Sequence, residues 1–475
     1  MKKYFLLLIA SLSIFNIISA QKKWTLEECV DYAFDKNLQI KSQTLETRIS
    51  QNQLQSSRLA FLPSINAASS ENFTFGRSVD PYTNDFSSEN FNSSNFQIST
   101  GTVLFQGFQN HYNLKKAESD ALASEVQLQR VKNNMSLAIA AAYLNVLFAA
   151  DLVEMAKLQK NTTIEQLEKI KILVNEGSLP LQNLYDTQAQ LANDEYNIVN
   201  YENQYKTALL TLAQLIEYED FLNFDIQKPD LSNIEQQIIL PSINEIYQEA
   251  LHKMPEIKYA GLKVLSADYN YKIARSMLMP RLSLSASYGT GYSSARKMIS
   301  DIQLSTPFLS GFTVDPNGNI LDVYQYSFNY TYQTKPFWDQ FKENASAAVM
   351  FNLSIPIFNS YQTRTNYKNS EIFLEQYRIQ EEQARKDLLK EIQQAYNDFQ
   401  SALKKMIAAE KSLSAAEINF NFTNKRYEQG LITQADFNIS KNNLYRSQIE
   451  YIRTKYDYVF KLKILDFYRG IPIRL

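Results

Sequence analysis

The chain has very little of what most folds use to turn and to crosslink. Its 475 residues include 11 glycines, 12 prolines and a single cysteine, Cys29, whereas average usage gives glycine about 7% and proline about 5% of positions. One cysteine cannot form an internal disulfide. Few turn residues imply few turns, so the helices and strands must be long. This composition argues against a compact globular enzyme.

Charge imbalance and catalytic motifs are missing as well. The 48 basic and 50 acidic residues are well mixed and leave a net charge of −2, which gives no basic footprint for nucleic acid. The two histidines, His111 and His252, stand in no metal-ligand or triad spacing, and no glycine-rich phosphate loop is present. We therefore expect no enzyme, no metal and no cofactor, so that energy for any transport must come from a partner.

The N-terminus has the layout of a secretory signal. Two lysines precede an apolar run from Tyr4 to Ile18, and Ser19-Ala20 offers a small-residue cleavage site. The apolar run is too short to span a bilayer stably. We predict a signal peptide over residues 1–20 and find no second apolar stretch of about 18 residues that indicates a spanning helix. If the protein enters a membrane, it must do so as strands.

The rest of the chain contains an internal repeat. Residues 24–40 resemble residues 241–257, which lie 217 positions later. Each copy opens with a hydroxyl residue and a glutamate three positions on, the capping-box spacing that marks the start of a helix. The two boxes are Thr25 with Glu28 and Ser242 with Glu245. Each expected helix runs about 38 residues and stops at a proline, Pro63 or Pro280.

After each proline the apolar period changes from helical to two. Leu282, Leu284, Ala286 and Tyr288, for example, alternate with small or polar residues. The four expected strands lie at about 64–75, 96–106, 281–290 and 345–358. A length of about ten residues suits a tilted transmembrane strand with apolar side chains toward lipid, although an ordinary half-buried hairpin has the same pattern.

A very long helix follows each pair of strands. The segments from Phe105 to Gly177 and from Phe358 to Gly430 are both 72 residues long and contain no proline. The expected helices, at about 107–176 and 360–429, would each be roughly 100 Å long. Apolar residues in strict 4-3 spacing run through both helices in register, which indicates a coiled coil.

These elements divide the chain into two repeats. The first repeat is expected over 21–223 and the second over 242–470, joined by a linker at 224–241 and followed by a tail at 471–475. Sharp turns are expected at 177–181 and 430–434, each before a returning helix. The second repeat is longer because about 36 residues are inserted between its strands, near 289–344, which reads as a surface loop without periodicity.

Four membrane-type strands are too few to close a barrel, and open strand edges are not tolerated in lipid. Three chains would pool twelve strands, an even number within the range of outer-membrane barrels. The predicted fold is therefore mainly α with a β-barrel part. It consists of a duplicated helix–strand–strand–long helix–helix repeat, whose long helices pack as a tube.

The order of these motifs resembles the TolC-like family of outer-membrane efflux proteins, over nearly the whole chain from about Trp24 to Arg469. The motifs that carry the resemblance are LEECVDYA, the strand ends VLFQGFQN and IPIFNSYQT, and the turns NEGSLPLQNL and EQGLITQADF. The resemblance implies a trimeric channel-tunnel in the outer membrane of a Gram-negative bacterium, with a twelve-stranded β-barrel and a long periplasmic α-helical barrel. It also implies a passive exit duct of a tripartite efflux or type I secretion system.

The partners implied by this resemblance are two further copies of the chain, outer-membrane lipid, a periplasmic adaptor (membrane fusion) protein and an inner-membrane transporter, and no nucleic acid. The loops near 76–95 and 289–344 would then lie outside the cell, and the two sharp turns would form the periplasmic tip. Nothing in the residues indicates whether the cargo is a small molecule or a protein.

The resemblance also assigns site residues at the two turns. Gly177 and Gly430 stand where a helix ends, a position that glycine occupies without conformational penalty, and the resemblance places them where adaptors engage. Asp436 would join two copies of itself in a ring of carboxylates at the closed end. The alternative is that Thr433 and Asp436 form another capping box.

The remaining gate positions are only partly kept. Tyr427 matches a gate tyrosine of the family, whereas its counterpart in the first repeat is Val174. Asn183 replaces the acidic residue of the first turn, and Ile432 stands where the best-known member has an arginine. A lock between helices must therefore use other partners, with neighbouring Arg426 as one candidate.

Two other classes of protein share long helices. A structural or adhesive coiled-coil protein of the cell envelope would explain the helices but not the strand pairs or the duplication. A soluble periplasmic adaptor would have one helical hairpin flanked by compact β-domains rather than two full repeats. The export channel is the leading hypothesis.

Overall fold

The computed structural model describes residues 22–82, 84–88, 90–229 and 241–474. They form two compact units. The helical unit contains the described residues of Met1–Gln53, Lys116–Asp268 and Ile372–Leu475, and the strand unit contains those of Leu54–Lys115 and Tyr269–Glu371. The predicted signal peptide, residues 1–20, lies outside the described residues, as does most of the predicted linker at 224–241.

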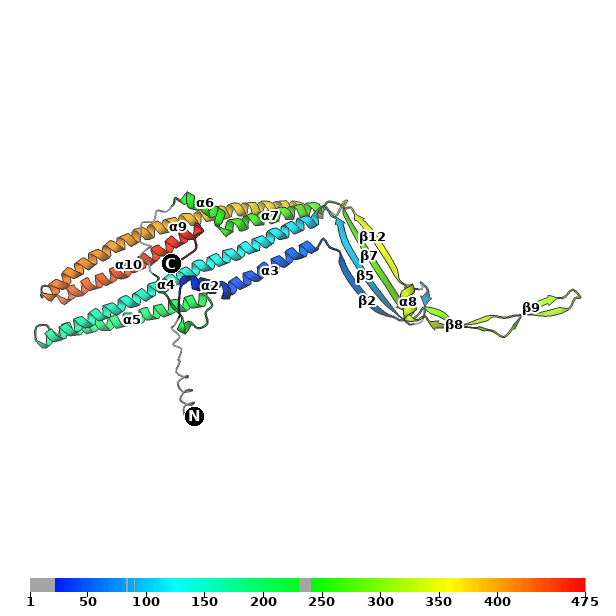
Figure 1. Cartoon of the computed structure of the whole chain (residues 1–475), viewed down its shortest axis with the longest axis horizontal. Helices are drawn as coiled ribbons and strands as arrows, with labels where there is room; N and C mark the ends of the chain where they lie inside the picture. Colours follow the sequence, from blue (N-terminus) through cyan, green and yellow to red (C-terminus); the bar gives the residue numbers. More distant parts are fainter. Residues whose placement is uncertain (1–21, 83, 89, 230–240, 475) are drawn as a thin grey trace, which may run out of the picture. The chain divides into compact units, whose positions relative to one another are not determined.

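Two long helical hairpins dominate the helical unit (Figure 1). The first pairs α4 (Gln109–Asn175) with α5 (Leu181–Leu215), and the second pairs α9 (Gln362–Glu428) with α10 (Gln434–Tyr468). Helices α4 and α9 each contain 67 residues, which confirms two very long helices uninterrupted by proline. Most of the predicted 4-3 stripe is buried. Its buried members include Met135, Ile139, Val146, Ala149, Leu388, Ile392, Phe399 and Ala402.

The first described residues pack against the helical core. Strand β1 (Lys23–Trp24) pairs in parallel with β6 (Asp225–Ile226), which follows the short 3-10 helix η1 (Phe221–Asn223). The buried hydroxyl of Tyr143 on α4 donates to the Trp24 carbonyl at 3.0 Å, so α4 is tied to this strand. Cys29 is also buried, and burial raises the pKa of its thiol to about 12, so the thiol is unreactive.

The two expected helices of about 38 residues are wrong, because each is broken once. The first consists of α2 (Leu26–Lys36) and α3 (Leu38–Leu59), and the second of α6 (Ile243–Lys253) and α7 (Pro255–Ser276). The residues between them, Asn37 and Met254, both adopt extended backbone conformations.

The cause of the break differs between the two copies. The Asn37 side-chain oxygen accepts from the backbone N–H groups of Gln39 and Ile40, which caps α3. In the second copy, proline at position 255 favours an extended residue before it and is well suited to the first turn of a helix. Both capping boxes predicted at the starts of α2 and α6 are present.

One further expectation needs correction. By length and composition alone, α4 is apolar enough to cross a membrane, whereas no such stretch was expected after the signal. Nearly half of its most apolar window is buried inside the structure, and its buried residues include Ile139, Leu144 and Leu147. The apolar run therefore packs in the helical core, and a buried core helix can meet the same length and composition criteria.

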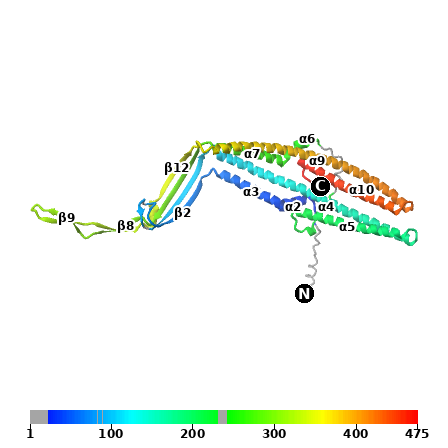
Figure 2. The ribbon, with the colours of Figure 1, turned by 180° about the vertical axis from the view of Figure 1, so that it is seen from behind.

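The strand unit contains a four-stranded antiparallel sheet in the order β12-β7-β5-β2 (Figure 2). The strands are β2 (Ser64–Thr74), β5 (Phe91–Phe105), β7 (Arg281–Ser293) and β12 (Ser346–Ser354). Strand β5 starts earlier than expected. Strand β12 stops earlier, before Pro356, since proline cannot donate to the ladder.

The register gives the sheet two chemically different faces. One row across the sheet is Ile65, Thr100, Ala286 and Val349, and the next row on that face is Ala67, Ile98, Tyr288 and Ala347. The opposite face carries rows such as Asn66, Ser99, Ser287 and Ala348. The prediction that the apolar residues of all four strands share one face is confirmed, and we call the two sides the apolar face and the polar face of the sheet.

The duplication is also visible in the backbone at the junctions between strand and long helix. Gly107 and Phe108 both have positive φ, and so do Ser360 and Tyr361, which stand at the equivalent positions of the second repeat. A side chain at Gly107 would lie 2.9 Å from the Met279 side chain. Both repeats therefore use the same left-handed turn. Glycine at position 107 avoids a close contact with Met279.

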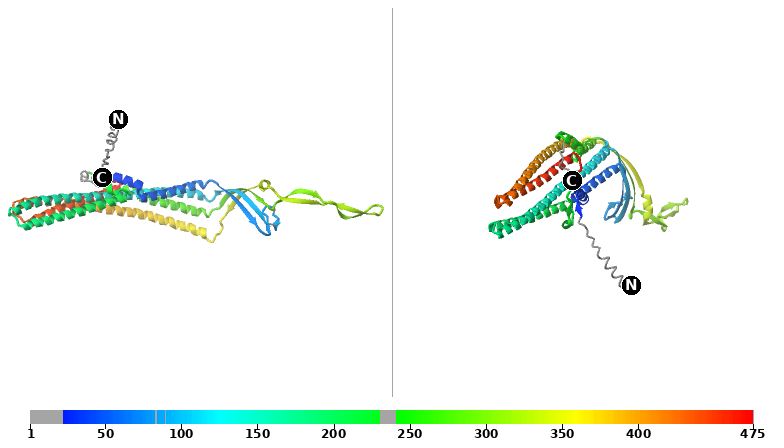
Figure 3. Two further views of the ribbon diagram at one scale, coloured as in Figure 1. Left: turned by 90° about the horizontal axis from the view of Figure 1, so that it is seen from below. Right: turned by 60° about the vertical axis from the view of Figure 1, so that its left-hand side comes forward.

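The expected loop at 289–344 is wrong as a description of that segment, because most of it is regular structure. Beyond β7, the chain forms β8 (Lys297–Leu304), β9 (Phe308–Val314), β10 (Ile320–Gln325), β11 (Phe328–Thr334) and the helix α8 (Phe337–Glu343). Strand β8 pairs with β11, and β9 with β10, so that residues 297–334 make one long two-stranded ribbon (Figure 3, left). The shorter loop near 76–95 holds the small hairpin β3 (Ser78–Val79) and β4 (Phe86–Ser87).

Candidate functional site at the hairpin tips

Both helical hairpins turn with the same backbone motif. Gly177 and Gly430 have φ of +74° and +71°. The N–H of Gly177 donates to the Val174 carbonyl at 3.0 Å, and the next N–H reaches back to Leu173 at 2.8 Å. The second tip repeats both bonds at Gly430 and the residue after it. These are Schellman motifs, in which a left-handed glycine satisfies the last carbonyls of the helix.

We predict that Gly430→Ala lowers the free energy of unfolding by about 1–2 kcal/mol per chain, the cost of a left-handed conformation for a residue with a side chain. No atom lies within 4 Å of the position of a new Cβ, so backbone strain is the only cost. Gly261 on α7 is equally open but has an ordinary φ. Gly261→Ala should therefore stabilise the protein, by up to about 1 kcal/mol. Thermal unfolding of both variants in detergent measures the difference, and a loss of stability in both would contradict the prediction.

The second tip begins its returning helix with a capping box. The Asp436 N–H donates to the Thr433 hydroxyl at 3.1 Å, and the Thr433 N–H donates to the Asp436 carboxylate at 3.4 Å. This is the alternative that the spacing allowed for Asp436. The residue is nevertheless exposed, so a carboxylate remains at the tip. In the first tip Pro180 stands at the N-cap and offers no side-chain bond.

Tyr427 joins α9 to α10 near the tip of the second hairpin, and its partner Gln434 reaches the first hairpin. Its ring stacks on Phe437 with centroids 4.6 Å apart, and its hydroxyl hydrogen-bonds to the Gln434 side-chain oxygen. The Gln434 amide nitrogen then donates to the hydroxyl of Thr187 on α5 at 3.1 Å. Burial raises the pKa of Tyr427, so the phenol stays protonated. Asn183 lies in the first turn of α5, where its backbone carbonyl accepts from Thr187 at 2.8 Å.

A second link between the hairpins was not found from the sequence. Lys441 on α10 is only 4% exposed, and its ammonium group lies 2.7 Å from the hydroxyl of Thr163 on α4. That hydroxyl in turn donates to the carboxylate of Asp194 on α5, which also accepts from Gln190 at 2.8 Å. We call these four residues the lysine cluster. Burial lowers the pKa of Lys441, and the nearby Asp194 opposes that shift.

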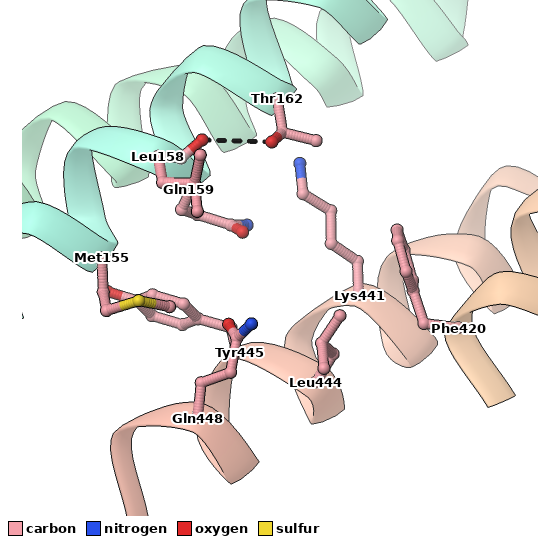
Figure 4. Close-up of a pocket in the computed structure, with 9 residues that line it drawn as sticks. All are labelled: Met155, Leu158, Gln159, Thr162, Phe420, Lys441, Leu444, Tyr445 and Gln448. Atoms are coloured by element: carbon pink, nitrogen blue, oxygen red, sulfur yellow. Dashed lines mark hydrogen bonds between the residues drawn. The ribbon is translucent and has the colours of Figure 1, made fainter. Parts of the chain in front are cut away.

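Figure 4 shows Lys441 extended from its helix toward α4 beside Thr162, with Tyr445 and Phe420 close by. These residues line a pocket of about 170 Å³. The one sequence signal for the cluster is a charge on a packed helical face, since Lys441 follows the buried Phe437 by four positions. A lysine in that place needs partners from other helices to remain buried.

The geometry at the tips holds helices together and has no catalytic arrangement. Among the described residues no group of three or more histidine, cysteine or acidic side chains is placed to hold a metal. The bonds of Gln434, which Tyr427 holds, and of Lys441 both join the second hairpin to the first. What such an arrangement can do is keep two helical hairpins close, or release them when the bonds break.

Comparison with known proteins gives one consistent result. The family model described as outer membrane efflux protein matches residues 30–216 and 246–468. The outer membrane protein TolC of Vibrio cholerae is 22% identical over 464 residues, covering 97% of this chain and 94% of that protein. The alkaline protease secretion protein AprF of Pseudomonas aeruginosa is 21% identical over 362 residues, or 75% of this chain, and this chain spans 66% of its length.

Solved structures with the same fold are also channels. A CusC crystal structure superposes with a TM-score of 0.74 at 15% identity and covers 94% of this chain and 92% of that one. The CmeC outer membrane channel of Campylobacter jejuni gives a TM-score of 0.72 at 15% identity, covering 96% and 87%.

Proposed function

The chain belongs to the outer membrane efflux protein family, and we propose that three copies of it form a continuous passive duct, a twelve-stranded β-barrel joined to a periplasmic α-helical tunnel. It is a non-enzymatic protein of the Gram-negative outer membrane that serves efflux or secretion. The trimer, its tripartite partners and the gate are the parts that we propose.

The observation that carries the proposal is the open, two-faced sheet. Within the described chain, β2 and β12 each pair with a single neighbour, so both edges have unpaired backbone groups. Apolar side chains such as Ile65, Val349 and Phe351 project from the exposed apolar face. Lipid would suit that face but not the open edges. Joining β2 of one copy to β12 of the next pairs every edge and gives twelve strands, with the apolar face toward lipid.

The helical hairpins support the tunnel. Helices α4 and α9, with 67 residues each, are roughly 100 Å long. Six such helices from three copies, with their returning partners, would supply a wall of the length that a periplasmic duct needs. Since no phosphate-binding loop is present in the sequence, we propose that an inner-membrane transporter supplies the energy and that a periplasmic adaptor connects the two.

We place the gate and the adaptor contact at the hairpin tips. The exposed turns at Gly177 and Gly430 would meet the adaptor. Three exposed Asp436 carboxylates would line the closed end, one per chain, because the first hairpin has Asn183 at the equivalent position. Gln434, held by Tyr427, and the lysine cluster would keep the second hairpin against the first in the closed state. Ile432 stands where the family's arginine would be, and these bonds would replace the lock that the arginine makes.

No residue of this chain indicates the class of cargo. Relatives include a protein named for alkaline protease secretion and another named for pyoverdine export, the OpmQ protein of Pseudomonas putida. Proteins and small molecules are therefore both open. A structural or adhesive role, the alternative considered from the sequence, has no support in the relatives.

Planar bilayers test the proposal directly. We expect the purified full-length protein to migrate as a heat-modifiable trimer and to give discrete single-channel conductance steps, because a closed twelve-stranded barrel would hold water. Mass in detergent and fractionation with the outer membrane are measured in the same preparation. A soluble monomer without conductance would contradict the trimeric duct.

A further inference from the structure

The ribbon at residues 297–334 exposes many large apolar side chains outside the four-stranded sheet. In its β8–β11 part, three cross-strand pairs lie on one face: Leu304 with Phe328, Ile302 with Tyr330, and Ile299 with Tyr332. We call these six residues the ribbon patch. Each is between 45% and 60% exposed. The opposite face carries Asp301, Gln303, Asn329, Thr331 and Gln333. A patch of large apolar side chains on one face marks an interaction surface.

The ribbon is anchored too firmly to be a loose loop. At its base the buried Gln340 of α8 accepts from the Ser293 N–H at 3.0 Å and donates to the carbonyls of Ser293 and Lys335 at 2.9 and 2.8 Å. The N–H of Lys335 bonds to the Arg296 carbonyl at 2.9 Å, and the Arg296 guanidinium pairs with Glu343 at 3.0 Å. Both arms of the ribbon are thus held at the end of β7.

We propose that the ribbons of three copies pack against one another through the ribbon patch and form a collar beyond the channel exit. This inference rests on the proposed trimer. The ribbon connects β7 to the edge strand β12, and the free edge of β12 is where the next copy would join. A threefold assembly therefore brings three identical patches to the same height around one axis.

The low charge and the length of the ribbon both favour packing against the ribbons of other copies. Only four of the 38 ribbon residues are charged, Lys297, Asp301, Asp315 and Asp322, and none belongs to the ribbon patch. Each arm is roughly 60 Å long. Twelve strands about 4.8 Å apart and tilted by about 40° give a barrel radius of about 12 Å, so the three bases would lie about 20 Å apart. Since packed sheets lie about 10 Å apart, a small convergence along the arms brings the patches into contact.

The strand pairing indicates contact through faces rather than through edges. The register shifts between Thr331 and Tyr332 and again between Val323 and Tyr324. Such bulges twist an edge and discourage further strand pairing. Across the shift in the β8–β11 part, Ile299 and Tyr332 stay on the same face as Ile302 and Tyr330, so the patch stays available for packing.

Crosslinking within the purified full-length trimer tests the collar. Tyr330→Cys places a thiol in the ribbon patch, and Thr331→Cys places one on the opposite face of the same strand; the native Cys29 is buried. With a short bismaleimide we expect Tyr330→Cys to give at least fivefold more crosslinked dimer than Thr331→Cys. Ile302→Cys and Gln303→Cys form a second matched pair, which serves if a tyrosine variant fails to fold.

The outcomes separate the collar from the trimer. Conductance and mass are recorded first on each variant. Conducting trimers in which the two faces crosslink equally overturn the collar and leave the duct intact. Conducting trimers in which a bimane label at Tyr330→Cys is quenched by brominated lipid also overturn it, because the patch then lies on the membrane. Absence of any trimer overturns the proposed function itself, and with it the collar.

Discussion

Replacing Val349 by lysine is expected to abolish assembly of the protein in the outer membrane, whereas the same change at the neighbouring Ala348 is expected to leave assembly intact. Val349 is exposed in the middle of β12 and shares its row with Ile65 and Ala286 on the apolar face. Ala348 lies in the row of Ser287 and Asn66 on the polar face. The two positions are adjacent on one strand and differ mainly in the face they occupy.

The expected size of the effect decides the outcome. A lysine on the lipid face near the middle of a transmembrane barrel costs about 2–4 kcal/mol, and three copies would carry about 6–12 kcal/mol. That is comparable to the whole stability of a typical domain, about 5–15 kcal/mol. A lysine toward a water-filled interior keeps its hydration, so Ala348→Lys loses little.

The measurement is the yield of heat-modifiable trimer in the outer-membrane fraction, with conductance of the purified Ala348→Lys protein as a check on its pore. Equal yields for the two variants would show that the apolar face does not meet lipid, and the proposed barrel would fail. The reverse order, with Ala348→Lys the more damaging, would mean that the faces are assigned the wrong way round.

The sequence predicted the parts of the fold that depend on a local period. The alternation from Leu282 to Tyr288 and the 4-3 spacing along α4 and α9 each lie within a single element. The apolar face of the strand and the packed stripe of each helix can therefore be recognised from the sequence alone. The duplication helped to align the elements, because corresponding residues of the two repeats lie at fixed offsets in the sequence. The break at Met254 was also present in the sequence, as a residue before proline, but the helical pattern continued on both sides and concealed it.

The ribbon was missed because its bulges interrupt the alternation. Ile299 pairs across from Tyr332 while Asp301 pairs with Thr331, so Ser300 is an extra residue in β8. Leu309 and Gly311 are likewise separated by an unpaired Ser310 in β9. Apolar residues on one face are then three positions apart, Ile299 to Ile302 and Leu309 to Phe312. A spacing of three breaks the alternation of two that marks a strand in a sequence.

The lysine cluster was missed for a different reason. Its members come from three helices, and Lys441 is 278 positions from Thr163 and 247 from Asp194. The sequence of α10 alone shows only a lysine on a packed face, and such a lysine commonly extends its ammonium group to water. Only the packing of α10 against α4 and α5 brings together an ammonium group, a hydroxyl and a carboxylate and excludes solvent from all three.

The lysine cluster leads to the second large expected effect, which is that Lys441→Met opens the duct. Methionine has a similar length but no charge, so the Asp194 carboxylate would remain buried without its cation. Breaking a direct buried ion pair typically costs about 3–5 kcal/mol, and we expect a smaller cost here because the Thr163 hydroxyl stands between the two charges. The bond between α10 and α4 is also lost, which leaves the Gln434–Thr187 contact as the neighbouring link between the hairpins. We expect a lower unfolding temperature and a larger open fraction in single-channel records.

A second substitution distinguishes loss of a latch from general damage. In Lys441→Met with Asp194→Asn no charge is left uncompensated, and replacing a buried ion pair by neutral groups is often neutral or stabilising. The double variant should therefore recover most of the unfolding temperature while it keeps the raised open fraction, because the link to Thr163 is still missing. Lys411→Met, on an exposed position of α9, should change neither quantity. If the double variant recovers stability and closure together, the cluster stabilises the tip without holding the gate shut; if Lys441→Met alone matches the unchanged chain in both measurements, the cluster is not a latch at all.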